Sequence, residues 1–163
     1  MRANRINHVS IFARDLEESA RFYEELFEVE RLPTARFPQG PVLWLKLGNQ
    51  QLHLFESAGN EPTLRHHFGI DVDDFDAVYA KAKELGVLDT DAFGAGLRGH
   101  PMGWVQMYVR DPAGNLVEVD WPDAQTLAAA TLDEMVPLES MTRQEGEAAV
   151  ATLYHEATRT GVA

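Results

Sequence analysis

The sequence predicts an α+β fold made of two βαβββ modules followed by a helical C-terminal extension. Three observations support this. A stretch near the N-terminus is repeated 59 residues later, both copies are followed by strand-like segments in the same order, and the end of the chain lies outside the repeat. We place the first module at residues 1–57, the second at residues 66–122 and the extension at residues 123–163. The two modules together form a single domain of about residues 5–122, an ordinary domain size.

The repeat begins at His8 with HVSIFARDLEESARFYEELFEVE and again at His67 with HFGIDVDDFDAVYAKAKELGVLD. Both copies start as strands and continue with apolar residues at helical spacing. Asp15 and the pair Asp73–Asp74 mark the helix starts, where negative charge is favourable, and Gly86 suits the end of the second helix. An internal duplication is favoured over chance, because the order of elements agrees as well as the identities. The identical pairs are His8/His67, Ile11/Ile70, Asp15/Asp74, Glu25/Glu84 and Leu26/Leu85.

Further strand-like segments complete each module after its helix. In the first module they are RLPTARF, PVLWLKLG and QQLHLFES. In the second they are a stretch near residues 92–97, then GWVQMYVRD and NLVEVDW. The last two are joined by RDPAGN, with proline early and Gly-Asn late, as turns favour. The segment SAGNEPTLR, residues 57–65, is the expected linker between the modules.

The extension has helical patterns in DAQTLAAATLDEMV and TRQEGEAAVATLYHEATR, interrupted at Pro137. Thr142 and Glu145 have the spacing of a capping box. A helix here would pack either on its own sheet or on a partner subunit, and the pattern leaves both open. Its apolar stripe consists of Val150, Leu153, Tyr154 and Ala157.

The composition excludes several classes of partner. The formal net charge is -12, from 26 acidic and 14 basic residues, and no cluster of lysine or arginine offers a surface for nucleic acid or an anionic membrane. No run approaches the roughly 18 apolar residues of a membrane span, and MRANRINHVS lacks the apolar core of a secretory signal. Without cysteine the chain has no disulfide, thiolate nucleophile or cysteine metal site, and a cytoplasmic protein is expected.

Four polar residues occupy comparable places in the two modules. His8 and His67 lie on the first strands. His53 and Glu118 lie on the last strands, and these two have apolar neighbours before and after them. Each alone has an ordinary explanation as a core, rim or surface residue. If the two sheets close on each other, however, the four side chains converge in one cleft. Imidazole and carboxylate ligands suit Zn²⁺, Ni²⁺, Co²⁺, Mn²⁺ or Fe²⁺ rather than calcium or copper(I).

The chain resembles the vicinal oxygen chelate superfamily, which includes glyoxalase I, type I extradiol dioxygenases, methylmalonyl-CoA epimerases, fosfomycin-resistance thiol transferases and bleomycin-resistance proteins. The resemblance rests on INHVSIFARDLEESARFYEELF, QLHLFE, HHFGIDVDDFDAVYAKAKELG and MYVRDPAGNLVEVDW, within residues 6–121. It implies paired modules forming an eight-stranded mixed-sheet cup around one divalent transition metal ion. It also implies His8, His67 and Glu118 as metal ligands and puts His53 at a fourth ligand position that often holds Glu or Gln.

The resemblance also suggests catalytic roles. Glu118 would take part in proton transfer as well as ligation. Independently of the resemblance, Ser10 lies two residues after His8 on the same strand face and could donate a hydrogen bond to a bound oxyanion, with an ordinary strand serine as the alternative. Tyr108 matches, by its place before VRDP, a tyrosine that contacts substrate in the thiol-transfer branch. The glycine-rich residues 94–103 are expected to form a mobile loop whose Arg98 and His100 could close over an anionic substrate. The potassium loop of the thiol-transfer branch is not recognisable, which argues against fosfomycin resistance.

Three functions follow from the resemblance. The first is a metal-dependent lyase or isomerase acting on a small oxygenated substrate at a His/His/His/Glu site. The second is an Fe(II) extradiol-type ring-cleavage dioxygenase, which needs a three-ligand site because substrate and O₂ both require open positions. The third is a non-catalytic drug-binding dimer. A homodimer is expected in each case, and in one arrangement His8 comes from one chain while His67 and Glu118 come from the other.

Overall fold

The computed structural model describes residues 6–36, 40–57, 59 and 65–154 of the chain. The first module forms a four-stranded sheet in the order β1-β4-β3-β2, in which β1 and β4 are parallel and the other neighbours antiparallel. One helix packs on it. The elements are β1 (His8–Ala13), α1 (Leu16–Phe27), β2 (Glu30–Leu32), β3 (Val42–Leu47) and β4 (Gln50–Glu56).

The second module repeats this arrangement with strand order β5-β8-β7-β6, again parallel only between its first and last strands. A short strand from the extension, β9 (Val136–Pro137), adds to the β6 edge and makes a five-stranded sheet. The predicted α+β fold of paired modules is confirmed. The strands form two sheets, however, rather than one continuous cup in a single chain. The elements are β5 (His67–Asp71), α2 (Phe75–Leu85), β6 (Leu97–Gly99), β7 (Val105–Arg110) and β8 (Leu116–Trp121).

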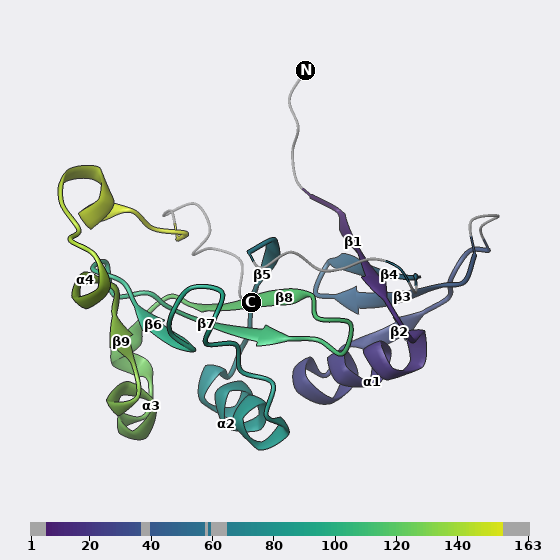
Figure 1. The fold of residues 1–163 in the computed structure, drawn as a ribbon, viewed down its shortest axis with the longest axis horizontal. Helices are drawn as coiled ribbons and strands as arrows, with labels where there is room; N and C mark the ends of the chain where they lie inside the picture. Colours follow the sequence, from purple (N-terminus) through teal and green to yellow (C-terminus); the bar gives the residue numbers. More distant parts are fainter. Residues whose placement is uncertain (1–5, 37–39, 58, 60–64, 155–163) are drawn as a thin grey trace.

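The helix starts and stops follow from local chemistry. Asp15 and Asp74 are the N-caps, and their carboxylates accept hydrogen bonds from the backbone N–H groups three residues later at 2.8 and 2.9 Å. Gly86 ends α2 with φ at +68°, a left-handed conformation that glycine adopts without strain. Both helices lie on the same side of their sheets (Figure 1), which leaves the opposite sheet faces for a site.

The two modules are joined through a buried hydrogen bond. The Tyr23 hydroxyl on α1 donates to Asp111 Oδ2 in the β7–β8 turn at 3.0 Å, and the two residues are 2% and 4% exposed. The Asn115 amide donates to the same carboxylate oxygen and to the Phe12 carbonyl, both at 2.7 Å. The turn of one module is therefore held against the helix and first strand of the other.

Tyr23→Phe should lower the free energy of unfolding by about 1–3 kcal/mol, because it removes a partner from a buried carboxylate. Denaturant unfolding followed by circular dichroism measures this loss. Tyr79→Phe is the matched control, since the Tyr79 hydroxyl donates to Glu134, which is about half exposed. A loss no larger than that of the control would show that the joint contributes little.

The extension differs from the predicted pair of helices. Its described part, residues 123–154, contains only short helices, α3 (Ala129–Asp133) and α4 (Leu138–Met141), with 3₁₀ turns at Ala124–Thr126 and Gly146–Val150. Thr142 is extended and Gly146 has φ at +58°, so the predicted capping box does not start a helix. Of the predicted stripe, Ala157 lies outside the described residues.

The described part of the extension packs on its own chain. Thr131 and the Ala128 N–H bind the Asp76 carboxylate on α2. Further along, the Trp104 indole N–H donates to the Ala151 carbonyl at 3.2 Å. No helix in the described part of the chain is long and apolar enough to cross a membrane.

Candidate metal centre

The first module presents two stacked imidazoles on the open face of its sheet. β1 and β4 pair with Ser10 opposite His53. The rings of His8 and His53 lie with centroids 4.5 Å apart and an interplanar angle of 18°. Leu52 and Leu54, on either side of His53, are 2% and 0% exposed and point into the core. Strand alternation therefore places His53 on the open face.

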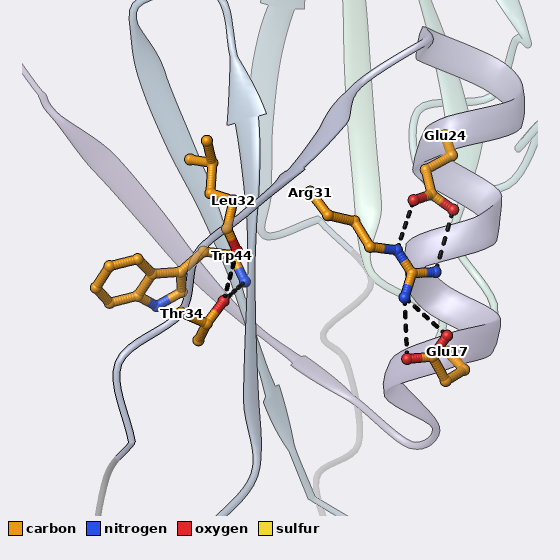
Figure 2. A network of polar contacts seen from close by, with 6 residues as sticks. All are labelled: Glu17, Glu24, Arg31, Leu32, Thr34 and Trp44. Atoms are coloured by element: carbon orange, nitrogen blue, oxygen red, sulfur yellow. Dashed lines mark hydrogen bonds and ion pairs between the residues drawn. The ribbon is translucent and has the colours of Figure 1, made fainter.

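Trp44 supports His53 from the other side. It lies opposite His53 on β3, and the two rings stack with centroids 4.5 Å apart and an interplanar angle of 10°. The Trp44 backbone N–H donates to the Thr34 hydroxyl at 3.0 Å, and that hydroxyl donates to the Leu32 carbonyl at 3.0 Å (Figure 2). His53 is thus held between two rings in a defined orientation.

The same region of β2 is tied to α1 by a forked ion pair. Arg31 donates to Glu24 at 2.6 and 3.2 Å and to Glu17 at 2.8 and 3.0 Å (Figure 2). These hydrogen bonds hold the pKa of Glu24 below its usual value. The network keeps the edge of the first sheet in register with its helix.

Both imidazoles of this module have the hydrogen bonding of metal ligands. His8 Nδ1 lies 2.6 Å from the Asn7 side-chain oxygen, and His53 Nε2 lies 2.8 Å from that of Gln51. Amide oxygens only accept, so each of these ring nitrogens donates and the other keeps its lone pair. Burial, followed by the nearby His8, lowers the pKa of His53 and favours its neutral, ligating form. A ligating histidine is commonly oriented in this way through its second nitrogen.

The second module pairs an imidazole with a carboxylate. His67 Nδ1 donates to the Arg65 carbonyl at 2.7 Å, so the neutral ring carries its lone pair on Nε2. That nitrogen lies 3.4 Å from Glu118 Oε2. Two lone-pair atoms at this spacing can both bind a cation at about 2.0–2.2 Å from each. The pair therefore has the geometry of two ligands of one ion.

The register of the two pairs is equivalent in the two modules. Gly69 lies opposite Glu118, so in each module the last-strand candidate faces the residue two positions after the first-strand histidine. A Cβ on Gly69 would lie 2.9 Å from Asp120 Oδ2 and 3.6 Å from Glu118 Oε1. The missing side chain leaves room for the two carboxylates.

One chain does not bring the two pairs together. Within residues 6–36, 40–57, 59 and 65–154, no group of three or more His, Asp or Glu could hold a metal ion. We call the His8/His53 pair the first half-site and the His67/Glu118 pair the second half-site. Their nitrogen and oxygen donors suit a divalent transition metal, but a complete site needs both halves.

The two other predicted site residues lie beside the half-sites. Ser10 is exposed on the open face opposite His53. Tyr108 is 2% exposed and lies opposite Glu118. Burial, followed by the Glu118 carboxylate, raises the pKa of Tyr108, so its hydroxyl stays protonated and can act as a hydrogen-bond donor.

The sequence reasoning missed Asp120. It is 5% exposed on the same face as Glu118, and burial together with that neighbouring carboxylate raises its pKa. Opposite it, Asp71 accepts a hydrogen bond from the Tyr154 hydroxyl of the extension at 2.7 Å. The signal was present, because the alternation that selects Glu118 in NLVEVDW selects Asp120 as well.

The expected mobile loop at residues 94–103 is partly a strand. β6 pairs with β7 on one side and with β9 on the other, which buries Arg98 to 7% exposure. His100 stacks on Trp104 with ring centroids 3.4 Å apart, and its Nε2 lies 2.7 Å from Gln106 Oε1. Arg98 and His100 are thus fixed in place, because strand pairing with the extension orders a segment that glycines alone would leave free.

A cleft of about 930 Å³ lies elsewhere, between the end of α1, the β3–β4 turn and the start of α2. Its lining is mainly acidic and apolar and includes Glu25, Glu28, Asp73 and Asp74. None of the four predicted ligands lines it. We therefore place the candidate metal centre at the half-sites, because of the ligand-type residues there, and not in this cleft.

A family model described as Glyoxalase/Bleomycin resistance protein/Dioxygenase superfamily matches residues 5–119. The chain belongs to this superfamily. Among curated relatives, human mitochondrial methylmalonyl-CoA epimerase is 25% identical over 130 residues, which cover 71% of this chain and 73% of the epimerase.

Solved structures of the superfamily show the same fold. A putative glyoxalase family protein from Bacillus anthracis aligns with a TM-score of 0.59 and 26% identity, covering 74% of this chain and 96% of that one. Lactoylglutathione lyase from Agrobacterium tumefaciens aligns with a TM-score of 0.56 and 25% identity, covering 73% and 94%. The predicted resemblance is confirmed, and the named relatives include enzymes.

Proposed function

We propose that this chain is a divalent-metal-dependent enzyme acting on a small oxygenated substrate, with lyase or isomerase chemistry. The observation that carries the proposal is that the two half-sites lie at equivalent positions in the two modules. In each histidine one ring nitrogen makes a supporting hydrogen bond, and the other nitrogen keeps a lone pair for a metal ion. Two equivalent pairs of ligand-type residues are hard to explain by core packing, since the three histidines are at least partly exposed and Glu118 is a buried carboxylate beside one of them.

We further propose that two copies of the chain complete the site. The first half-site of one chain would meet the second half-site of the other, giving a His/His/His/Glu set. The open face of the first strand supports this, because Phe12 shares it with His8 and is 49% exposed, and Ile6, two residues before the strand, is 67% exposed. Large apolar side chains gathered on one face favour a covering partner.

The roles of the residues follow from their positions. A metal bound at the site would act as a Lewis acid on a substrate oxygen. Glu118 is buried beside His67 and can hold or release a proton at its carboxylate oxygen. Tyr108, protonated and buried, can donate a hydrogen bond to a substrate oxygen where negative charge develops. Ser10, opposite His53, can donate a second one from the other half-site.

His53 decides between the reaction types. Four protein ligands leave about two positions on an octahedral ion, enough for a chelating substrate but not for substrate and O₂ together. The stacking of His53 between His8 and Trp44 favours the four-ligand set, since the ring is held in place. That set favours lyase or isomerase chemistry over ring cleavage.

His53→Ala should lower bound metal by about tenfold or more after dialysis, measured by plasma mass spectrometry on anaerobically purified, untagged protein. Gln51→Ala is the control for the supporting hydrogen bond and should have a smaller effect. Iron at about one per chain, unchanged by His53→Ala, would instead indicate a three-ligand dioxygenase site. No metal in the wild type, even after reconstitution, would contradict the enzyme proposal and favour the drug-binding dimer.

A further inference from the structure

The guanidinium of Arg98 is buried without matching acceptors. Arg98 is 7% exposed, and its Nε and Nη2 atoms have no hydrogen-bond partner. An unmatched buried charge costs stability, so native proteins retain one mainly where it serves a purpose. The two unpartnered atoms therefore point to a ligand.

These two atoms lie on one edge of the guanidinium plane, where their N–H bonds run nearly parallel. A planar carboxylate accepts such a pair with one oxygen on each N–H. A carboxylate of a ligand therefore matches both donors.

Arg98 faces the same side of the sheet as the second half-site. It lies opposite Gln106 on β7, which in turn lies opposite Asp120 on β8, two residues after Glu118. Directly opposite residues, and alternate residues on one strand, share a face. A ligand on Arg98 is therefore on the face that carries Glu118.

Two aromatic rings connect Arg98 with His67. The guanidinium carbon lies 5.1 Å from the Phe93 ring centroid and 5.3 Å from that of Tyr108. Both rings also meet the His67 imidazole edge-on, at centroid distances of 5.6 and 5.9 Å. Arg98 and His67 thus contact the same two rings, which places a carboxylate on Arg98 in the neighbourhood of the second half-site.

The negative charge of the whole chain makes Arg98 more important for binding an anion. At a formal net charge of -12, the protein repels anions at long range. A fixed cation in a buried position supplies a local attraction that the surface does not.

We propose that Arg98 binds a carboxylate of the substrate, so that the substrate is a small oxygenated carboxylic acid. This inference rests on the proposed function for the reacting part of the substrate. The inference adds that the group by which the substrate is anchored to the protein is a carboxylate.

Nitrogen-15 NMR of the full-length protein tests the proposal directly. Lactate, propanoate and benzoate are titrated while the Nε–H signal of Arg98, assigned by its loss in Arg98→Met, is followed. Lactate should move this signal to lower field in a saturable way, and lactamide, its uncharged analogue, should not. Equal shifts with lactate and lactamide, or no shift with any of the three acids, would overturn the proposal.

Variants separate a binding role from a structural one. Arg98→Met should weaken lactate binding at least tenfold and Arg98→Lys by less, whereas Arg143→Met, at an exposed arginine, should leave it unchanged. Without ligand, Arg98→Met should raise the melting temperature by about 3–5 °C, because it removes an unmatched buried charge. Retained lactate binding, or a marked loss of stability, in Arg98→Met would overturn the proposal.

Metal analysis of the same samples distinguishes this proposal from the proposed function. Arg98→Met should keep the wild-type metal content, since Arg98 is not a ligand. Lactate binding through Arg98 in a protein that takes up no metal would contradict the enzyme proposal only. Metal uptake without an Arg98 response to the acids would contradict the carboxylate proposal only.

Discussion

An equimolar mixture of His8→Ala and Glu118→Ala chains, unfolded and refolded together, should recover about one quarter of the wild-type metal sites and activity. Random pairing makes half of the dimers mixed. In a shared site, each mixed dimer has one site with both substitutions and one with neither. Either variant alone has a damaged ligand in every site, so the mixture should exceed both.

This mixing experiment is the strictest test of the proposal that each metal site combines half-sites from two chains. Bound metal after dialysis and turnover are measured on the mixture and on each variant refolded alone. A second mixture, His67→Ala with Glu118→Ala, is the matched control. Both substitutions then fall in the same half-site, so no intact site can form. Equal recovery in the two mixtures, or none in either, would show that the sites are not shared as proposed.

Glu118→Ala and His67→Ala, tested singly, should each lower metal affinity by about 100-fold or more and remove activity to a similar degree. Both residues contribute a lone pair at the 3.4 Å contact between them, so loss of either leaves the second half-site with one ligand. Competition with a chromophoric chelator measures the affinity.

His66→Ala is the control for these variants, because it removes an exposed imidazole from the residue just before β5. Circular dichroism checks that the variants remain folded. An unchanged metal affinity in both Glu118→Ala and His67→Ala would contradict the assignment of the second half-site.

Much of the fold could be predicted because it depends on patterns among residues that are close together in the sequence. The helix caps at Asp15 and Asp74 act through their own backbone neighbours, so the sequence alone locates them. The alternation of Leu52, His53 and Leu54 likewise identifies the open face without knowledge of the partner strands. The periodicity of apolar residues and the capping of helices depend on neighbouring residues only, so the folded structure keeps what the sequence predicts for them.

The extension could not be predicted as well, since its conformation depends on distant partners. In the described part of its second helical pattern, residues 142–154, the Ala151 carbonyl accepts from the Trp104 indole and the Tyr154 hydroxyl reaches Asp71 on β5. Its first pattern ends where β9 pairs with β6. Short helices have little stability of their own, so such tertiary contacts decide their form. The same pairing with β9 turns the expected glycine-rich loop into the strand that buries Arg98.

The sequence by itself determined the duplication, the two βαβββ modules and the candidate ligands, because each rests on residue type and spacing along one chain. The tertiary structure decided how those residues are grouped. It stacks His8 on His53, brings His67 to Glu118 and keeps the two pairs on separate sheets. It also leaves one edge of the Arg98 guanidinium unmatched. Distances between strands and the burial of a charge arise only when distant segments pack, so no local pattern could have specified them.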